Sequence, residues 1–463
     1  MGKKRIQGKR RGPGRKPPLR DVLSRHRILA GILGVILLAL LAGSVHIAVQ
    51  SWGPHRDYEI DRVLPAPGQW PAVGDLEVGT SVRDITPDLD EYDAWQDVDG
   101  DGRFDPGIDS YTDRNGNGRF DLVWLAGFGR DRAAQGVHTP LSARAMAFRN
   151  NGVTLVLVSL DSIGLTLDRY ITVRKHVREI LPDVDHILFA ATHTHSAPDT
   201  LGLWSFGYLW NSRFDEAYLQ RVQAQAKEAV LEAVADLRPA RAILATAPVP
   251  RDNFTRDSRN PQVVDNQLPL AWFMEKEIGV SIGVLASWGM HPEALGSGSP
   301  WISADFAHYF REAMEKGLDG PGGFAGFGGD CVYFTGPVGG LMTQLGMDIV
   351  DRHGFRHTGN GIGMAMAQGE NLAVQGAAAL RGPGARPMED PRLAFSARTL
   401  YLPTGWPIRA AVHLGMVHPG LYGAKVKSEV NALRIGEIEI LATPGEIFPE
   451  IVYGGIETPQ GAD

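Results

Sequence analysis

The sequence has one cysteine, Cys331, among its 463 residues, which excludes an internal disulfide framework. Basic residues are scarce beyond the N-terminus. Residues 1–27 hold 11 of the 46 Lys and Arg residues and one of the 53 acidic residues, so the rest carries 35 basic and 52 acidic residues, a net charge of −17. Nucleic-acid binding by this acidic body is therefore not expected. A phosphate-binding loop is excluded as well, because no Gly-Lys-Ser/Thr follows the Gly-rich stretch at 322–340.

Long apolar runs are also rare, and the one at 28–49 is about long enough to cross a bilayer. Its clearly polar members are Ser44 and His46. Because the basic segment 1–27 precedes this run, the positive-inside rule places the N-terminus in the cytoplasm and the main domain outside it. We predict an uncleaved transmembrane signal anchor at 28–49, with a cleaved signal peptide as the alternative. A Pro-containing linker is predicted at 50–75.

From residue 76 onward, segments typical of strands and of helices alternate along the chain. Strands are predicted at 76–87, 143–148, 153–160, 186–189, 240–248, 279–288 and 433–442. Helices are predicted at 167–180, 214–237, 306–316 and 359–380. This alternation predicts an α/β fold of mixed β-sheets with flanking helices, in a single large domain at 76–463.

A pair of histidines follows one of these predicted strands. The segment Thr192-His193-Thr194-His195-Ser196-Ala197-Pro198 comes directly after the apolar run at 186–189. On an extended chain, residues two apart point to the same side, so the side chains of His193 and His195 would face the same way. Two imidazoles held this close suit a metal such as zinc, or a metal with a proton-transfer group. The alternative is a pair of hydrogen-bonded loop histidines.

A further histidine follows a second predicted strand. His291 comes after the apolar run at 279–288, within Gly289-Met290-His291-Pro292. A late carboxylate stands at Glu446, in Pro444-Gly445-Glu446. A zinc site requires this kind of convergence of ligands from different strands.

Two short repeats, sixteen residues apart, place oxygen-bearing side chains at regular intervals in an insert at about 93–123. Oxygen donors at positions 1, 3, 5 and 9 with Gly at position 6 are the arrangement of a calcium loop. The usual Glu at position 12 is missing, so the repeats resemble the shorter calcium loops of extracellular proteins and not regulatory EF-hands. We predict two structural calcium sites, with a disordered Asp/Gly-rich loop as the alternative. The predicted ligands are Asp97, Asp99, Asp101, Arg103 (backbone carbonyl) and Asp105, then Asp113, Asn115, Asn117, Arg119 (backbone carbonyl) and Asp121.

From residue 76 to 463 the chain resembles the N-terminal catalytic domain of the neutral/alkaline (non-lysosomal) ceramidase family, as a divergent member. The resemblance is carried by Val78-Gly79-Thr80 with Asp84-Ile85-Thr86, by Gly136-Val137-His138-Thr139-Pro140-Leu141 with Arg144-Ala145, by the segment 192–198, and by Pro444-Gly445-Glu446. It implies one bound zinc and cleavage of the amide of N-acyl-sphingoid lipids. The implied zinc ligands are His193, His291 and Glu446, and His195 would be a second active-site histidine. Arg256 stands where the family has an active-site arginine, and Arg259 competes for that position.

The chain departs from the family in two places. The family has an active-site serine in a Gly-Asp-Val-Ser segment, whereas here Gly329-Asp330 is followed by Cys331-Val332-Tyr333, so no serine stands there and Cys331 is one position off. A tyrosine ligand that the family carries well beyond Pro-Gly-Glu is absent, because the sequence stops at Asp463. The chain would then be truncated at its C-terminus.

Together these features predict a zinc-dependent hydrolase that cleaves the N-acyl amide of a sphingoid-type lipid with metal-activated water. His195 would transfer a proton to the leaving amine, and Arg256 would bind an oxyanion or an anionic product. Calcium would be a second, structural metal, and the partners would be a lipid amide and the membrane. The alternatives are a non-catalytic, calcium-stabilised surface protein on a decayed hydrolase fold, and a metallo-hydrolase of another amide or ester.

Overall fold

A computed structural model of the chain divides into two compact units, residues 1–50 and 51–463. It describes residues 19–50, 54–66, 68–70, 72–204, 215–340, 342–413, 421–422 and 425–453.

The first unit contains one long helix, α1 (Leu19–Gln50), of 32 residues. Its segment Leu29–His46 is apolar and long enough to cross a membrane, so the helix is a candidate anchor or signal sequence. The helix begins nine residues before the predicted apolar segment at 28–49. Its first turns, Leu19-Arg20-Asp21-Val22-Leu23, are largely good helix formers, so the helix extends beyond the apolar segment at its N-terminal end. Residues 1–18 of the predicted basic segment lie outside the described residues.

The second unit is built around a large mixed sheet. Its strands run in the order β16 (Asp330–Thr335), β12 (Ser281–Trp288), β11 (Gln267–Glu275), β9 (Arg238–Pro248), β2 (Leu76–Asp84), β6 (Ser142–Asn150), β7 (Val153–Leu160) and β8 (His186–Ala191), with β20 (Arg386–Pro387) paired to β9. The pairs β12–β16 and β7–β8 are parallel and the other pairs are antiparallel. The predicted fold of mixed sheets with flanking helices in one large domain is confirmed.

A second, antiparallel sheet packs against the first. It contains β1 (Asp61–Leu64), β21 (Leu393–Pro403), β23 (Lys425–Ile435), β22 (Leu421–Tyr422) and β24 (Ile438–Ala442). Strand β1 corrects the predicted linker at 50–75, because its residues pair with β21 from Asp61↔Arg398 to Leu64↔Phe395. Four residues between turn-forming prolines are too short a run for alternation to reveal a strand.

The remaining elements are helices and two-stranded ribbons. The helices are α2 (Leu167–Ile180), α3 (Glu216–Ala235), α4 (Phe306–Lys316), α5 (Ile362–Arg381), α6 (Trp406–His413) and α7 (Pro449–Tyr453), with a 3-10 turn at Leu89–Glu91. The ribbons are β3 (Ala94–Gln96) with β4 (Ser110–Thr112), β5 (Gly136–Val137) with β13 (Trp301–Ile302), β10 (Arg256–Asp257) with β17 (Met342–Thr343), β14 (Gly317–Leu318) with β15 (Phe324–Ala325), and β18 (Asp348–Val350) with β19 (Arg356–Thr358).

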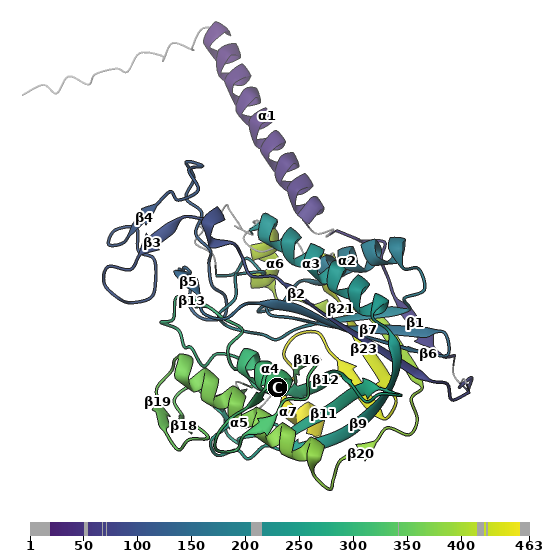
Figure 1. Cartoon of the computed structure of the whole chain (residues 1–463). Coiled ribbons are helices and arrows are strands. Elements are labelled where there is room, and N and C mark those ends of the chain that lie inside the picture. Colours follow the sequence, from purple (N-terminus) through teal and green to yellow (C-terminus); the bar gives the residue numbers. More distant parts are fainter. Residues whose placement is uncertain are drawn as a thin grey trace, which may run out of the picture. The chain divides into compact units, whose positions relative to one another are not determined.

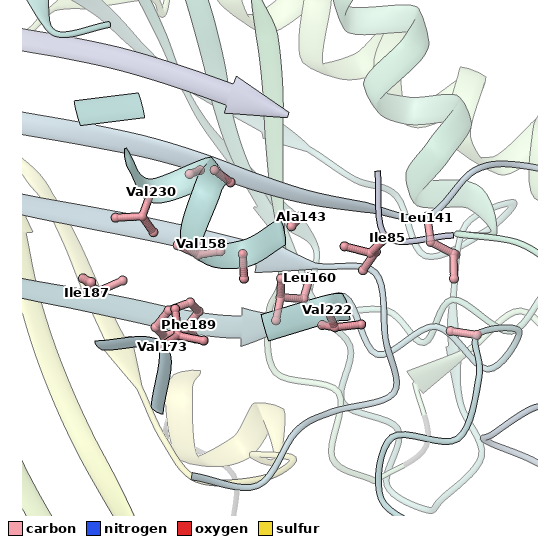
Figure 2. Close-up of a cluster of buried hydrophobic side chains, with 14 of the residues drawn as sticks. Ile85, Leu141, Ala143, Val158, Leu160, Val173, Ile187, Phe189, Val222 and Val230 are labelled. Carbon is pink, nitrogen blue, oxygen red and sulfur yellow. The ribbon is translucent and has the colours of Figure 1, made fainter. Parts of the chain in front are cut away.

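Both faces of the large sheet are buried. On β7, Leu155 and Leu157 belong to the core shared with the second sheet, together with Phe395. Val158 points to the opposite face, where it packs with Val222 of α3 and other residues of α2 and α3 (Figure 2). Helices α4 and α5 pack side by side, and α5 covers β9 and β11 (Figure 1). Two helix layers therefore enclose the two sheets.

The large sheet curves until its two ends meet. Strands β7 and β8 lie at one end of the strand order and β16 lies at the other. Nevertheless the Ser159 hydroxyl donates to the Tyr333 carbonyl at 2.6 Å, and the Thr335 hydroxyl donates to the Thr192 carbonyl at 2.5 Å. The chain segments that follow β8 and β12 are thereby brought into one region.

A buried histidine links the two sheets and makes stability depend on pH. The His186 imidazole stacks on Phe395 with ring centroids 5.0 Å apart, and its Nε2 lies 2.9 Å from Asn431 Oδ1. Burial, with a smaller contribution from Arg174, lowers the pKa of His186 to about 3. The unfolded chain binds this proton near pH 6.5. The stability that neutral His186 contributes is therefore complete above pH 6.5 and lost as the pH falls toward 3.

We expect the free energy of unfolding to fall by about 2 to 3 kcal/mol between pH 7 and about pH 4.5 through His186 alone. In His186→Gln, which keeps a polar group beside Asn431, this part of the pH dependence should disappear. Urea titrations of both proteins across this range measure the difference. Identical slopes for wild type and variant would contradict the prediction.

Candidate metal centre

The predicted histidine pair lies in a tight loop after β8. The two side chains are therefore not oriented by the alternation of an extended strand. Strand β8 ends at Ala191, and His193 has a φ of 66°, in the left-handed region. Hydrogen bonds to other segments of the chain fix the conformation of this loop. The His195 amide donates to the Pro292 carbonyl at 2.9 Å, and the Thr194 hydroxyl donates to the Ser303 carbonyl at 2.8 Å. The argument from an extended chain was wrong in its mechanism, although the two side chains do converge.

Three imidazoles meet in this region. One ring nitrogen each from His193, His195 and His291 lies within 4.8 Å of the others, and the ring centroids are 5.1 to 5.4 Å apart. Glu446 closes the group, with its carboxylate oxygens 3.2 Å from His193 Nε2 and 3.5 Å from His291 Nε2. These contacts with His193 and His291 hold the pKa of Glu446 far below its usual value. His291 is almost fully buried, whereas the Glu446 side chain is 45% exposed and marks the open side.

The two histidines nearest Glu446 are oriented through their other ring nitrogen. His193 Nδ1 lies 2.7 Å from the Ile163 carbonyl, and His291 Nδ1 lies 2.8 Å from the Met342 carbonyl. A carbonyl acceptor requires a proton on Nδ1, which leaves Nε2 with a free lone pair. Metal-binding histidines in proteins are commonly held in this way. Three nitrogens and one carboxylate also form a donor set that zinc accepts, so the residues fit a zinc ion.

No protein-family model matches the chain. Among solved structures, the neutral ceramidase from Pseudomonas aeruginosa matches with a TM-score of 0.56 at 16% sequence identity, over 81% of this chain and 62% of that one. A ceramidase complexed with C2 matches with a TM-score of 0.57 at 15% identity, over 81% of this chain and 64% of that one. The chain has the neutral ceramidase fold. It spans less than two thirds of either solved ceramidase.

Of the three imidazoles at this centre of the ceramidase fold, His195 is the one whose ring nitrogens make no hydrogen bond. It is 8% exposed, and neither ring nitrogen has a partner. Burial, with His193 and His291 nearby, holds the pKa of His195 well below its usual value. Gly127 packs so closely on the ring that a Cβ atom there would lie 2.4 Å from it, so this position requires glycine. The His195 ring is therefore tightly enclosed, and the polar groups beside it are the other residues of the centre and one carboxylate.

That carboxylate, Glu293, is a residue that the sequence analysis missed. Its Oε2 lies 3.3 Å from His195 Nδ1, and the Thr343 hydroxyl donates to its Oε1. Burial raises the pKa of Glu293. The signal that could have found it is its place two residues after His291, in a segment that also contacts the histidine loop.

The two arginines that competed for the predicted anion-binding role have different surroundings. Arg259 is engaged by Asp257 and Glu450, each at 2.8 Å. Arg256 has a buried Nε without a hydrogen-bond partner. The β10–β17 ribbon sets Arg256 opposite Thr343, which contacts Glu293. Of the two, Arg256 is the one that makes no ion pair among the described residues.

Cys331, one position from the place of the serine expected from the resemblance, is fully buried on β16. It packs in the core beneath α4 and α5, and burial raises the pKa of its thiol far above the usual value. This environment excludes a thiolate nucleophile at Cys331.

The predicted calcium insert is ordered as two related loops. The Asp97 carboxylate accepts hydrogen bonds from the Gly100 and Gly102 amides, and Asp113 accepts equivalent bonds from Asn117 and Gly118. Their two Phe side chains, Phe104 and Phe120, pack together at 5.0 Å between ring centroids. The repeats thus share a small core of their own, completed by Trp95, Leu122, Trp124 and Ala133.

Two carboxylates beside these loops were not predicted from the repeat. Asp109 joins Asp97 and Asp99 in a group whose ligand atoms lie within 4.8 Å of one another. Near the second loop, Asp93 is 5% exposed; one of its oxygens accepts from the Asp121 amide at 3.1 Å and the other has no partner. Burial raises the pKa of Asp93, and the hydrogen bond from the Asp121 amide opposes this shift. Three carboxylates this close together in the first loop fit a hard cation.

Proposed function

We propose that the protein is a zinc-dependent hydrolase that cleaves the N-acyl amide of a sphingoid-type lipid. The observation that carries this proposal is the convergence of His193, His291 and Glu446 at one point of a ceramidase fold. The three residues come from segments far apart in sequence, and two of them have their second ring nitrogen fixed by a carbonyl. A packed core has no need of such an arrangement, but a metal site does.

The residues divide the work of amide cleavage among them. His193, His291 and Glu446 would hold zinc, which polarises a carbonyl oxygen and lowers the pKa of a bound water toward neutrality. The exposed side of Glu446 is where a substrate would enter. Arg256, on the β10–β17 ribbon opposite Thr343, would donate from its guanidinium group to a developing oxyanion or an anionic product. His195 and Glu293 line the buried side of the centre.

An apolar cavity next to Glu446 supports a lipid substrate. The cavity has a volume of about 450 Å³ and is lined by Leu165, Leu167, Leu402 and Ile408 among others, and by Gly445, the neighbour of Glu446. Pockets of this size take a large part of a small ligand. We propose that it receives an apolar chain of the substrate while the amide lies at the metal.

Filling this cavity should change chain-length preference. Gly405 lines it, and a Cβ there would meet only the Pro407 ring, at 3.6 Å. We expect Gly405→Phe to lower kcat/KM for long-chain amides by about tenfold relative to short-chain ones, since each buried methylene contributes about 0.8 kcal/mol. Gly384→Phe, at an exposed site where a Cβ meets nothing within 4 Å, is the matched control. Equal losses for all chain lengths would contradict the assignment.

The apolar helix fits the same proposal. A membrane anchor at Leu29–His46 would keep the enzyme at the surface that contains its substrate. We propose that the N-terminus is cytoplasmic and that the main domain lies outside the cytoplasm, because 11 basic residues precede the apolar segment. Attachment of a membrane-impermeant reagent to an added cysteine in the main domain of intact cells tests this orientation.

Calcium is proposed as a structural ion of the two insert loops. We expect saturating calcium to raise the Tm of the wild-type protein by about 3 °C per occupied site. In Asp97→Asn/Asp109→Asn, about half of this increase should be lost, because only the first loop is changed. Calorimetry with calcium and with a chelator measures the effect, and Asp348→Asn outside the insert is the control. A Tm that does not depend on calcium would refute the assignment.

The proposed function is tested by metal analysis and lipid hydrolysis with the detergent-solubilised full chain. We expect about one zinc per chain and release of a fatty acid and a sphingoid base from N-acyl-sphingosine. Zinc with turnover only of a simple ester or another amide would favour a different substrate class. A folded protein that binds calcium but no zinc would support the non-catalytic alternative, which the missing serine after Gly329-Asp330 favours.

A further inference from the structure

The pair His195–Glu293 has the arrangement of a metal ligand with its orienting group. His193 and His291 each direct Nδ1 to a fixed acceptor, a backbone carbonyl, and Nε2 to the centre. In His195 the nitrogen closest to a fixed acceptor is again Nδ1, which lies 3.3 Å from Glu293 Oε2. The ring nitrogen left over is Nε2. His195 therefore shares with the other two histidines a fixed acceptor beside Nδ1, with a carboxylate in place of the carbonyl.

Burial makes this arrangement necessary for His195. The ring is 8% exposed, and neither nitrogen makes a hydrogen bond of normal geometry. An imidazole enclosed in this way loses the free energy of two hydrogen bonds to water, so a packed structure tolerates it only where something else binds the ring. One of its nitrogens belongs to the group of three that lie within 4.8 Å of one another. A metal ion at their centre would satisfy it.

Glu293 is itself held in place. Its side chain is 9% exposed, the Thr343 hydroxyl donates to Oε1, and the His195 amide is bonded to the neighbouring Pro292 carbonyl. The Glu293 oxygen that faces His195 therefore has little freedom to turn away. A carboxylate fixed beside Nδ1 selects the tautomer with the proton on Nδ1 and keeps Nε2 free to bind a metal.

We propose that His195 is a third imidazole ligand of the zinc and that Glu293 is the positioning residue that orients it. The centre would then have three histidines and Glu446 as ligands. This inference rests on the proposed function, because it concerns the same zinc. It replaces the proton-transfer role predicted for His195 from the sequence.

The test measures zinc affinity and coordination, and does not depend on turnover. We expect His195→Ala to raise the zinc Kd by at least about 100-fold and Glu293→Ala to raise it by about 10- to 100-fold, with Glu293→Gln intermediate because its amide oxygen still accepts from Nδ1. Competition with a chromophoric chelator gives each Kd. The visible spectrum of the Co(II)-substituted proteins should change in His195→Ala. Circular dichroism checks that each variant is folded.

X-ray absorption at the zinc edge of the wild-type protein counts imidazole ligands without any mutation. Three imidazoles would support the proposal. Two imidazoles, or a zinc Kd and a Co(II) spectrum in His195→Ala equal to those of wild type, would overturn it and leave the zinc hydrolase intact. A folded wild-type protein that binds no zinc would overturn the proposed function and this inference with it.

Discussion

Replacing both His193 and His291 by alanine is expected to abolish zinc binding and to lower kcat/KM for N-acyl-sphingosine by about 1,000-fold or more. The two side chains supply both imidazoles that contact Glu446, so only Glu446 and His195 would remain at the centre. Removal of the ion takes away several kcal/mol of charge stabilisation at the reacting carbonyl, which is a thousandfold in rate. Elemental analysis and product release by mass spectrometry measure the two effects.

The matched control for this experiment is His353→Ala, which removes an exposed histidine from the loop between β18 and β19. Calcium content should be the same in all three proteins, because the insert loops share no ligand with the centre. Full zinc content in the double variant would show that the ion binds elsewhere. Full activity in a double variant without zinc would refute the metal-dependent reaction.

The largest stability effect is expected from a buried ion pair behind the histidine loop. Arg311 of α4 donates to both oxygens of Asp161 at 2.8 and 2.9 Å, and the two side chains are 2% and 0% exposed. Asp161 also accepts from the Ser142 amide and from the Thr192 hydroxyl, next to His193. We expect Arg311→Met to lower the free energy of unfolding by about 3 to 5 kcal/mol, because it leaves a buried charge without its partner.

A double variant that replaces both charges of the Asp161–Arg311 pair by apolar side chains tests this explanation. In Asp161→Leu/Arg311→Met most of the loss should be recovered, since no lone charge remains, although the contacts of Asp161 with Ser142 and Thr192 are also gone. Lys316→Met, which removes an exposed ion pair with Glu312 on the same helix, should change stability very little. Urea unfolding monitored by tryptophan fluorescence gives the three values. A loss of less than about 1 kcal/mol in Arg311→Met would contradict the prediction.

Much of the architecture could be predicted because it depends on local periodicity. The runs at 153–160, 186–189 and 279–288 became β7, β8 and β12, and the histidines that follow β8 and β12 do meet. What could not be predicted is the curvature of the sheet that brings these ends together. Hydrogen bonds such as Thr335 to Thr192 join residues more than 100 positions apart and leave no pattern in a short window.

The same limit applied to single residues. Glu293, Asp93 and Asp109 belong to no repeat, and burial and distance in the folded chain are what single them out. Asp109 lies one position after the place where a calcium loop normally has its Glu, so a strict template passed over it. The histidine loop was recognised as a pattern, but the left-handed conformation of His193 depends on contacts made by the rest of the fold.

The meeting of the two sheet ends has a consequence for the order of assembly. The ligands proposed for the zinc, His193, His291 and Glu446, stand about 100 and 155 residues apart along the chain, and bonds across the curved sheet are what align them. Contacts so distant in sequence form late in folding, after most loop-closure entropy has been overcome. The unfolded chain therefore offers the neighbouring pair His193 and His195 but not the complete set of ligands. Zinc would bind after the two ends of the large sheet have already met. A shortage of metal should therefore yield folded, inactive molecules and not misfolded ones.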